Sequence, residues 1–111
     1  NDDITSKEKI LMTHAEATQL VLGKNNRMQR KVGNNTTARI LLNGSVAIQH
    51  FSTDIVVIHD DDSATLRHGG WKSPTTKKRI NKYSPVGVFQ KNWEWFTSHG
   101  TPFQEGMLVR A

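Results

Sequence analysis

Three β-rich runs in the middle of the chain constrain its fold more than any other feature. Residues 36–42 and 45–51 flank Asn43-Gly44, a dipeptide that accepts the positive φ angles of a two-residue type I′ turn. A third run, residues 53–59, follows almost at once. We therefore expect these runs to form an antiparallel meander.

Further strand signals extend the meander on its C-terminal side. Residues 54–58 are apolar on both faces of a strand, which is typical of a central position in a sheet. The other signals are a run at residues 63–68 after a triple-aspartate turn, a second small hairpin of residues 87–90 and 93–96 across Lys91-Asn92, and an edge strand within residues 105–110.

Two short helices are also predicted. Thr13 is a good N-cap and Glu16 stands three residues later, so the two form a capping box, and Gly23 is a typical C-terminal stop. Ser73-Pro74 has the order of an N-cap and a first helical residue.

These signals predict the fold class and the domain organisation. We expect an α+β fold: one antiparallel sheet of five or six strands with a central meander, and one or two short helices packed on it. A chain of 111 residues is sufficient for one such domain. The domain is predicted to span residues 13–111, and residues 1–12 are predicted to be a flexible N-terminal segment.

Composition excludes several classes of site. The chain has no cysteine, which rules out disulfides and thiolate zinc sites. No run approaches the roughly 20 apolar residues of a membrane span, and no signal-peptide pattern is present. The glycines follow no Walker or dinucleotide spacing, so no cofactor is expected.

Charge is segregated along the sequence. The formal net charge is +5, and two blocks, residues 17–53 and 63–92, contain no Asp or Glu. The second block carries seven cations: Arg67, Lys72, Lys77, Lys78, Arg79, Lys82 and Lys91. Such segregation favours a positive surface field and nucleic acid as a partner. The alternative is an ordinary solvated surface.

The junction at residues 68–81 is the main candidate site. Gly69 and Gly70 permit unusual backbone angles, and the free N–H groups there, next to a helix N-terminus at Ser73, would cradle an anion. The alternative is a tight turn that folds Trp71 onto the core. Both readings remain open at the level of sequence.

The basic helix that follows would present its cations to the ligand. Its Thr76, Ile80 and Tyr83 share an inward face. Arg79 and Asn81 are candidates for contacts to base edges, whereas the lysines would contact phosphates. The predicted nucleic-acid or anion-binding residues are Arg67, Gly69, Gly70, Lys72, Thr75, Lys77, Lys78, Arg79, Asn81 and Lys82.

The aromatic residues, histidines and acids allow other interpretations. Trp71, Tyr83, Trp93, Trp95 and Phe96 would either stack on unpaired bases or fill a small core. The run of residues 59–62 has oxygen ligands for a divalent ion but is also ordinary turn chemistry. Strand pairing of two among His50, His59 and His68 would suit a metal-independent nuclease. No catalytic or metal-binding residue is predicted.

A combination of short motifs resembles a family of small uncharacterised proteins found in tailed phages and some bacterial genomes. The motifs are Thr53-Asp54-Ile55-Val56, Gly69-Gly70-Trp71, Thr75-Thr76-Lys77, Arg79-Ile80-Asn81, a tryptophan at Trp93 or Trp95, and Phe103 with Gly106. The resemblance covers residues 34–108. It implies a phage or phage-derived origin and no particular mechanism.

The sequence therefore predicts a small phage-type binding protein without enzymatic activity, with nucleic acid as the preferred partner. One alternative is a protein-interaction module, either an inhibitor of a host protein or a small structural component of the virion. Another is a small metal-independent nuclease. The expected location is the host cytoplasm or the virion, with no membrane association, and the sequence leaves the oligomeric state open.

Overall fold

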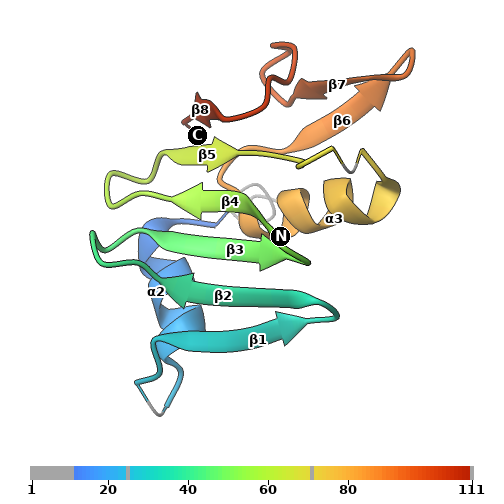
Figure 1. The fold of residues 1–111 in the computed structure, drawn as a ribbon. Helices are drawn as coiled ribbons and strands as arrows, with labels where there is room; N and C mark the ends of the chain where they lie inside the picture. Colours follow the sequence, from blue (N-terminus) through green and yellow to red (C-terminus); the bar gives the residue numbers. More distant parts are fainter. Residues whose placement is uncertain (1–11, 25, 71, 111) are drawn as a thin grey trace, which may run out of the picture.

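A six-stranded antiparallel sheet in the order β1-β2-β3-β4-β5-β8 forms the body of the protein (Figure 1). The computed structural model describes residues 12–24, 26–70 and 72–110. The strands are β1 (Gln29–Gly33), β2 (Thr36–Ile40), β3 (Val46–His50), β4 (Thr53–Ile58), β5 (Ala64–Leu66) and β8 (Met107–Val109). The predicted meander is confirmed, and β3 and β4 are the central pair. Most of the predicted flexible N-terminal segment, and Trp71, lie outside the described residues.

The tight turns differ from their predicted positions. In the β2–β3 loop the Leu41 N–H donates to the Ser45 carbonyl at 2.8 Å, and only Gly44 has a positive φ. The loop therefore has three residues, and the prediction of a type I′ turn at Asn43-Gly44 is wrong. The Asn43 side chain instead accepts the Ser45 N–H at 2.9 Å, which stabilises the longer loop.

The second hairpin is formed by β6 (Val88–Lys91) and β7 (Glu94–Thr97), and it contains the type I′-like turn. Lys91 pairs with Glu94, so the loop is Asn92-Trp93, one residue later than predicted. Both loop residues have positive φ, 52° and 68°. Such angles match the right-handed twist of the flanking strands.

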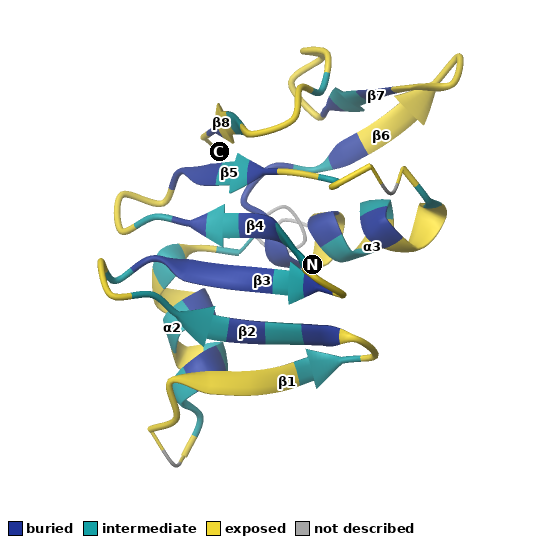
Figure 2. Ribbon diagram, viewed as in Figure 1, coloured by how far each residue is buried: buried dark blue, intermediate teal, exposed yellow. Residues whose placement is uncertain are grey.

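Both helices pack on the same face of the large sheet. The N-cap of α2 (His14–Leu22) is Thr13, in the predicted capping box with Glu16, and the N-cap of α3 (Pro74–Tyr83) is Ser73. Apolar side chains from both helices and from the sheet form one buried cluster, which includes Ala17, Val21, Ile48, Val56, Leu66, Ile80 and Tyr83 (Figure 2). The structure is thus the expected α+β single domain. No helix within the described residues is long and apolar enough to cross a membrane.

The opposite face of the sheet carries both polar and apolar side chains, and no described helix covers it. Arg39 and Asp54 join neighbouring parts of this face through two hydrogen bonds of 2.7 and 2.9 Å. One end of the sheet, at the β1–β2 and β3–β4 turns, meets the N-terminal half of α3, where the candidate site lies.

Candidate functional site

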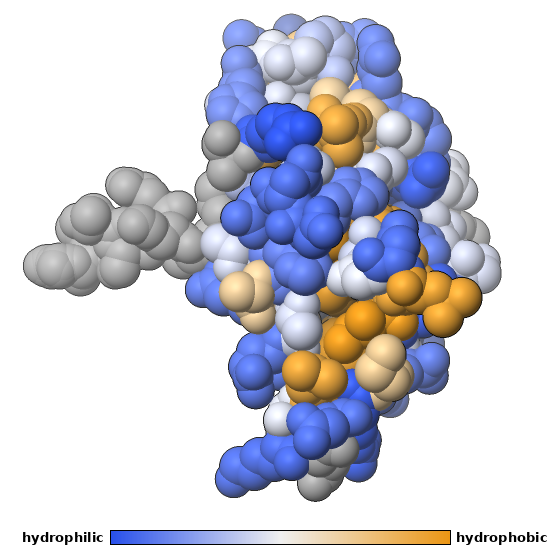
Figure 3. Space-filling view, turned by 90° about the vertical axis from the view of Figure 1, so that its left-hand side faces the viewer, coloured by the Kyte–Doolittle hydropathy of each residue, from blue (hydrophilic) through white to orange (hydrophobic). Residues whose placement is uncertain are grey.

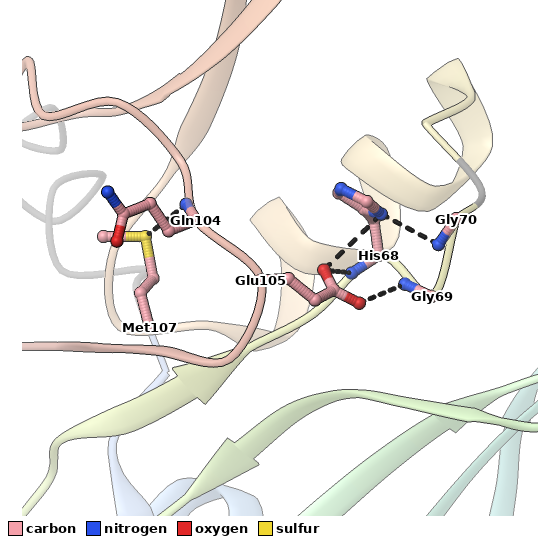
Figure 4. Close-up of polar contacts among 6 residues, drawn as sticks. All are labelled: His68, Gly69, Gly70, Gln104, Glu105 and Met107. Carbon is pink, nitrogen blue, oxygen red and sulfur yellow. Dashed lines mark hydrogen bonds and ion pairs between the residues drawn. The ribbon is translucent and has the colours of Figure 1, made fainter.

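The glycine-rich junction before α3 is already occupied by a carboxylate of the chain itself (Figure 4). The His68 and Gly69 N–H groups donate to the two carboxylate oxygens of Glu105 at 2.8 and 2.7 Å, and the Gly70 N–H donates to His68 Nδ1 at 2.9 Å. Successive backbone N–H groups do make an anion-binding concavity. Its anion is Glu105, so the prediction that Gly69 and Gly70 offer free N–H groups to a phosphate is wrong.

The two glycines are required by the turn itself. Gly69 and Gly70 have φ values of 61° and 87°. A Cβ at Gly69 would also collide with the Thr53 side chain, whereas one at Gly70 would meet open space. The tight turn of the alternative interpretation is therefore confirmed, whereas the predicted packing of Trp71 on the core lies outside the described residues.

Helix α3 presents three different faces. Thr76, Ile80 and Tyr83 are buried against the sheet, as predicted. A second face meets the β6–β7 hairpin. Here the Asn81 side chain donates to the Val88 carbonyl at 3.0 Å and accepts the Val88 N–H, and Lys77 Nζ donates to Gln90 at 3.3 Å. The Asn81 amide thus holds β6, which removes it from the set of base-reading candidates.

The third face of α3 borders a pocket of about 480 Å³, which we call the α3 pocket. The pocket lies where the β1–β2 turn and the end of β3 meet the N-terminal half of the helix. Its lining residues are Asn34, Asn35, His50, Phe51, Ser73, Thr75, Thr76, Lys78 and Arg79. Thr75, Lys78 and Arg79 from the predicted site therefore converge here.

The α3 pocket is electropositive. None of the described residues that line it is acidic. Arg79 Nε is buried and has no hydrogen-bond partner within the described part of the chain. His50 is only 5% exposed, and burial, together with the nearby Arg79 charge, lowers its pKa below the ordinary value of 6.5. The pocket therefore presents cations and hydroxyl groups without an opposing carboxylate.

An aromatic ring lies beside these cations. Phe51 is 59% exposed, has a φ of 58°, and contacts the edge of the His50 ring at a centroid distance of 4.7 Å. Its N–H donates to the Asn35 carbonyl at 2.9 Å, so the two turns that border the pocket are fastened together. A bulky residue with positive φ is uncommon, and such backbone strain is often found at binding sites.

The other predicted cations are dispersed. The Arg67 side chain lies beside Gly106. Lys72 lines a separate pocket of about 200 Å³ with Trp95 and Phe103. Lys82 lies over the Tyr83 ring at 5.5 Å. The ten predicted residues therefore do not form one continuous site.

The predicted site did not include six residues that line the α3 pocket. They are Asn34, Asn35, His50, Phe51, Ser73 and Thr76. They come from the β1–β2 turn, the end of β3 and the start of α3, and only the packing of α3 brings them together. The asparagine pair is a turn signal, but a turn signal alone does not indicate which helix lies beside it.

His59 and Asp61, from the run of residues 59–62, have structural partners. His59 lies between the hydroxyl groups of Ser45 and Thr65, at 3.2 and 2.9 Å. Asp61 accepts hydrogen bonds from both the N–H and the hydroxyl of Ser63 and from Arg110, and these lower its pKa to about 2. Within residues 12–24, 26–70 and 72–110, no group of three or more metal-ligating side chains is present.

Comparison with known proteins places the chain among phage proteins. The profile of the Kyanoviridae Gp96 protein family matches residues 12–110. The chain belongs to this family. The Gp96 match extends beyond the motifs of residues 34–108 and confirms the phage origin that they imply. Searches of curated proteins and of solved structures gave no match.

Proposed function

We propose that this Gp96-family protein binds nucleic acid and that Lys78 and Arg79 hold a phosphate in the α3 pocket. The single observation that carries the proposal is the convergence of these two cations on a pocket whose described lining contains no carboxylate. Arg79 is especially suited to this role, because its buried Nε has no hydrogen-bond partner among the described residues and a guanidinium can donate two parallel hydrogen bonds to a phosphate.

The other lining groups fit the same ligand. The hydroxyl group of Thr75 and the amides of Asn34 and Asn35 are typical phosphate and sugar contacts. Phe51 offers a ring beside the cations. A pocket of about 480 Å³ has the size of a small-ligand site, so it would hold one nucleotide of a longer strand. We expect binding without turnover, in the host cytoplasm or the virion.

The test is fluorescence anisotropy with labelled single-stranded and duplex oligonucleotides at low salt. The double variant Lys78→Gln, Arg79→Gln should weaken binding at least tenfold, since each lost phosphate contact costs on the order of 1 kcal/mol. Lys24→Gln, which removes an exposed cation after α2, is the matched control and should bind almost normally. Undiminished binding by the double variant would overturn the proposal.

Incubation of labelled RNA and DNA with the protein, with and without Mg²⁺ or Mn²⁺, should leave both intact.

The protein-interaction alternative is favoured by a different part of the surface. Leu42 in the β2–β3 loop is fully exposed, on the side of the molecule where Figure 3 shows a band of hydrophobic surface. Exposed apolar surface of this kind often marks a protein contact. A photo-cross-linking residue at position 42 should then give one defined protein adduct in infected cells, and the same residue at position 24 should not.

A further inference from the structure

The tip of the β6–β7 hairpin exposes a tryptophan in an unfavourable backbone conformation. Trp93 is 86% exposed and has a φ of 68°, in the second position of the turn, where glycine is preferred. An L-residue with a bulky side chain is disfavoured there. The fold gains little from this indole, because it is almost entirely in solvent. Backbone strain at an exposed aromatic residue therefore points to a ligand contact.

The outer face of the same hairpin carries a second aromatic group. Phe89 pairs with Phe96, and their rings are stacked at a centroid distance of 5.7 Å. Phe89 is 43% exposed, whereas the inner face of the hairpin buries Val88 and Trp95. The core is thus filled from the inner face, and the outer aromatic side chains are not needed to complete it.

Polar groups beside Trp93 match the chemistry of a nucleotide. A shallow hollow of about 410 Å³ is lined by Lys77, Gln90, Asn92 and Trp93, none of them acidic. An indole can stack on a base, the two amides can hydrogen-bond to base edges, and the Lys77 ammonium can contact a phosphate. The nearby acid Glu94 lies directly opposite Lys91 in the hairpin.

We infer that the β6–β7 hairpin is a stacking platform for unpaired bases, and that the nucleic acid bound by this protein is single-stranded. The inference rests on the proposed function and deepens it. Bases in a duplex are stacked on each other, so their faces are not available to Trp93. In Figure 1, α3 lies between β6 and the β3–β4 turn. The consecutive residues Lys77 and Lys78 line the hollow and the α3 pocket, respectively, so one strand that crosses the helix can contact both.

The test compares the wild type with Trp93→Gly. Glycine relieves the backbone strain at position 93, so the melting temperature should not fall. The affinity for an unstructured single-stranded oligonucleotide should nevertheless fall about tenfold, because the contact to one stacked base is lost. The same oligonucleotide should also quench tryptophan fluorescence of the wild type more than that of the variant. A duplex of the same length should bind the wild type more weakly than the single strand does.

The outcomes separate this inference from the proposed function. If Trp93→Gly binds the single strand as the wild type does, while the double variant at Lys78 and Arg79 has lost binding, the stacking platform is wrong and the phosphate pocket stands. Equal losses of single-strand and duplex binding in Trp93→Gly would also overturn the platform. If the wild type binds no oligonucleotide at low salt, both ideas fail.

Discussion

At the scale of single residues, the position of a carboxylate decides which sites can accept an anion. The Glu105 carboxylate accepts hydrogen bonds from the N–H groups of His68 and Gly69, although Glu105 lies 36 residues after Gly69 in the sequence. The described lining of the α3 pocket contains no carboxylate, and there burial and the Arg79 charge lower the pKa of His50. Both places lie near the start of α3, but only the α3 pocket presents cations without a carboxylate in its described lining.

Protonation of His50 should make the stability of the protein and its affinity for a phosphate depend on pH. In the free protein the pKa of His50 is lowered by burial and by Arg79, so the unfolded chain takes up a proton more readily. The protein should therefore lose stability as the pH falls below about 6.5. A bound phosphate places a negative charge near His50 and raises its pKa again, so binding takes up a proton.

We accordingly expect the affinity for an oligonucleotide to rise as the pH falls from about 7.5 towards 5.5. Titrations by fluorescence anisotropy across this range measure the effect. In His50→Gln the affinity should be almost independent of pH over the same range. An equal pH dependence in His50→Gln would show that another group is responsible and that His50 does not sense the ligand.

At the scale of secondary-structure elements, one amide joins α3 to the second hairpin. Asn81 bonds both polar backbone groups of Val88, which is 4% exposed. Asn81→Ala would leave these groups buried without partners, so the free energy of unfolding should fall by about 1–3 kcal/mol. Urea denaturation measures this loss. Lys78→Ala, on an exposed position of the same helix, should change stability by less than about 0.5 kcal/mol. Similar losses in both variants would mean that the loss is not specific to the amide contact.

The elements were predictable where the signal is local. The capping box of Thr13 and Glu16, the Ser73 cap and the apolar run of β4 act within a few residues, and each appears in the structure. The turns were harder to predict, because the same dipeptide is compatible with more than one type of loop. At Asn43-Gly44 a side-chain hydrogen bond favours the longer loop, whereas the tight turn occurs at Asn92-Trp93, which has no glycine.

The candidate site was less predictable, because long-range packing determines it. Lys77 and Lys78 are adjacent in the sequence, yet one contacts Gln90 of the hairpin and the other lines the α3 pocket. The partner of Gly69 could not be identified either, since no short-range pattern pairs it with Glu105. Charge segregation indicated the helix that borders the α3 pocket but could not show how its neighbours divide its faces.

At the scale of the whole molecule, both helices pack on one face of the sheet (Figure 1). Helix α3 lies at one end of this face. The α3 pocket and the hollow beside Trp93 therefore border the same helix. Among the described residues, Lys77, Lys78, Arg79 and Lys91 line the two sites or stand beside them. Lys82, by contrast, lies over Tyr83, and Lys72 lies in its own small pocket. The proposed path of a single strand thus involves about four phosphate contacts.

This arrangement predicts two separable contributions to binding. Each phosphate contact to a single strand adds about 0.7 to the slope of log affinity against log salt, so four contacts should give a slope near −3. Lys78→Gln should reduce the steepness by about 0.7, since it removes one contact. Trp93→Gly should lower the affinity at every salt concentration and leave the slope unchanged, because stacking releases no counterions. Anisotropy titrations between about 50 and 200 mM salt measure both quantities. A change of slope in Trp93→Gly would mean that the indole positions a cation instead of a base, and an unchanged slope in Lys78→Gln would remove Lys78 from the path of the strand.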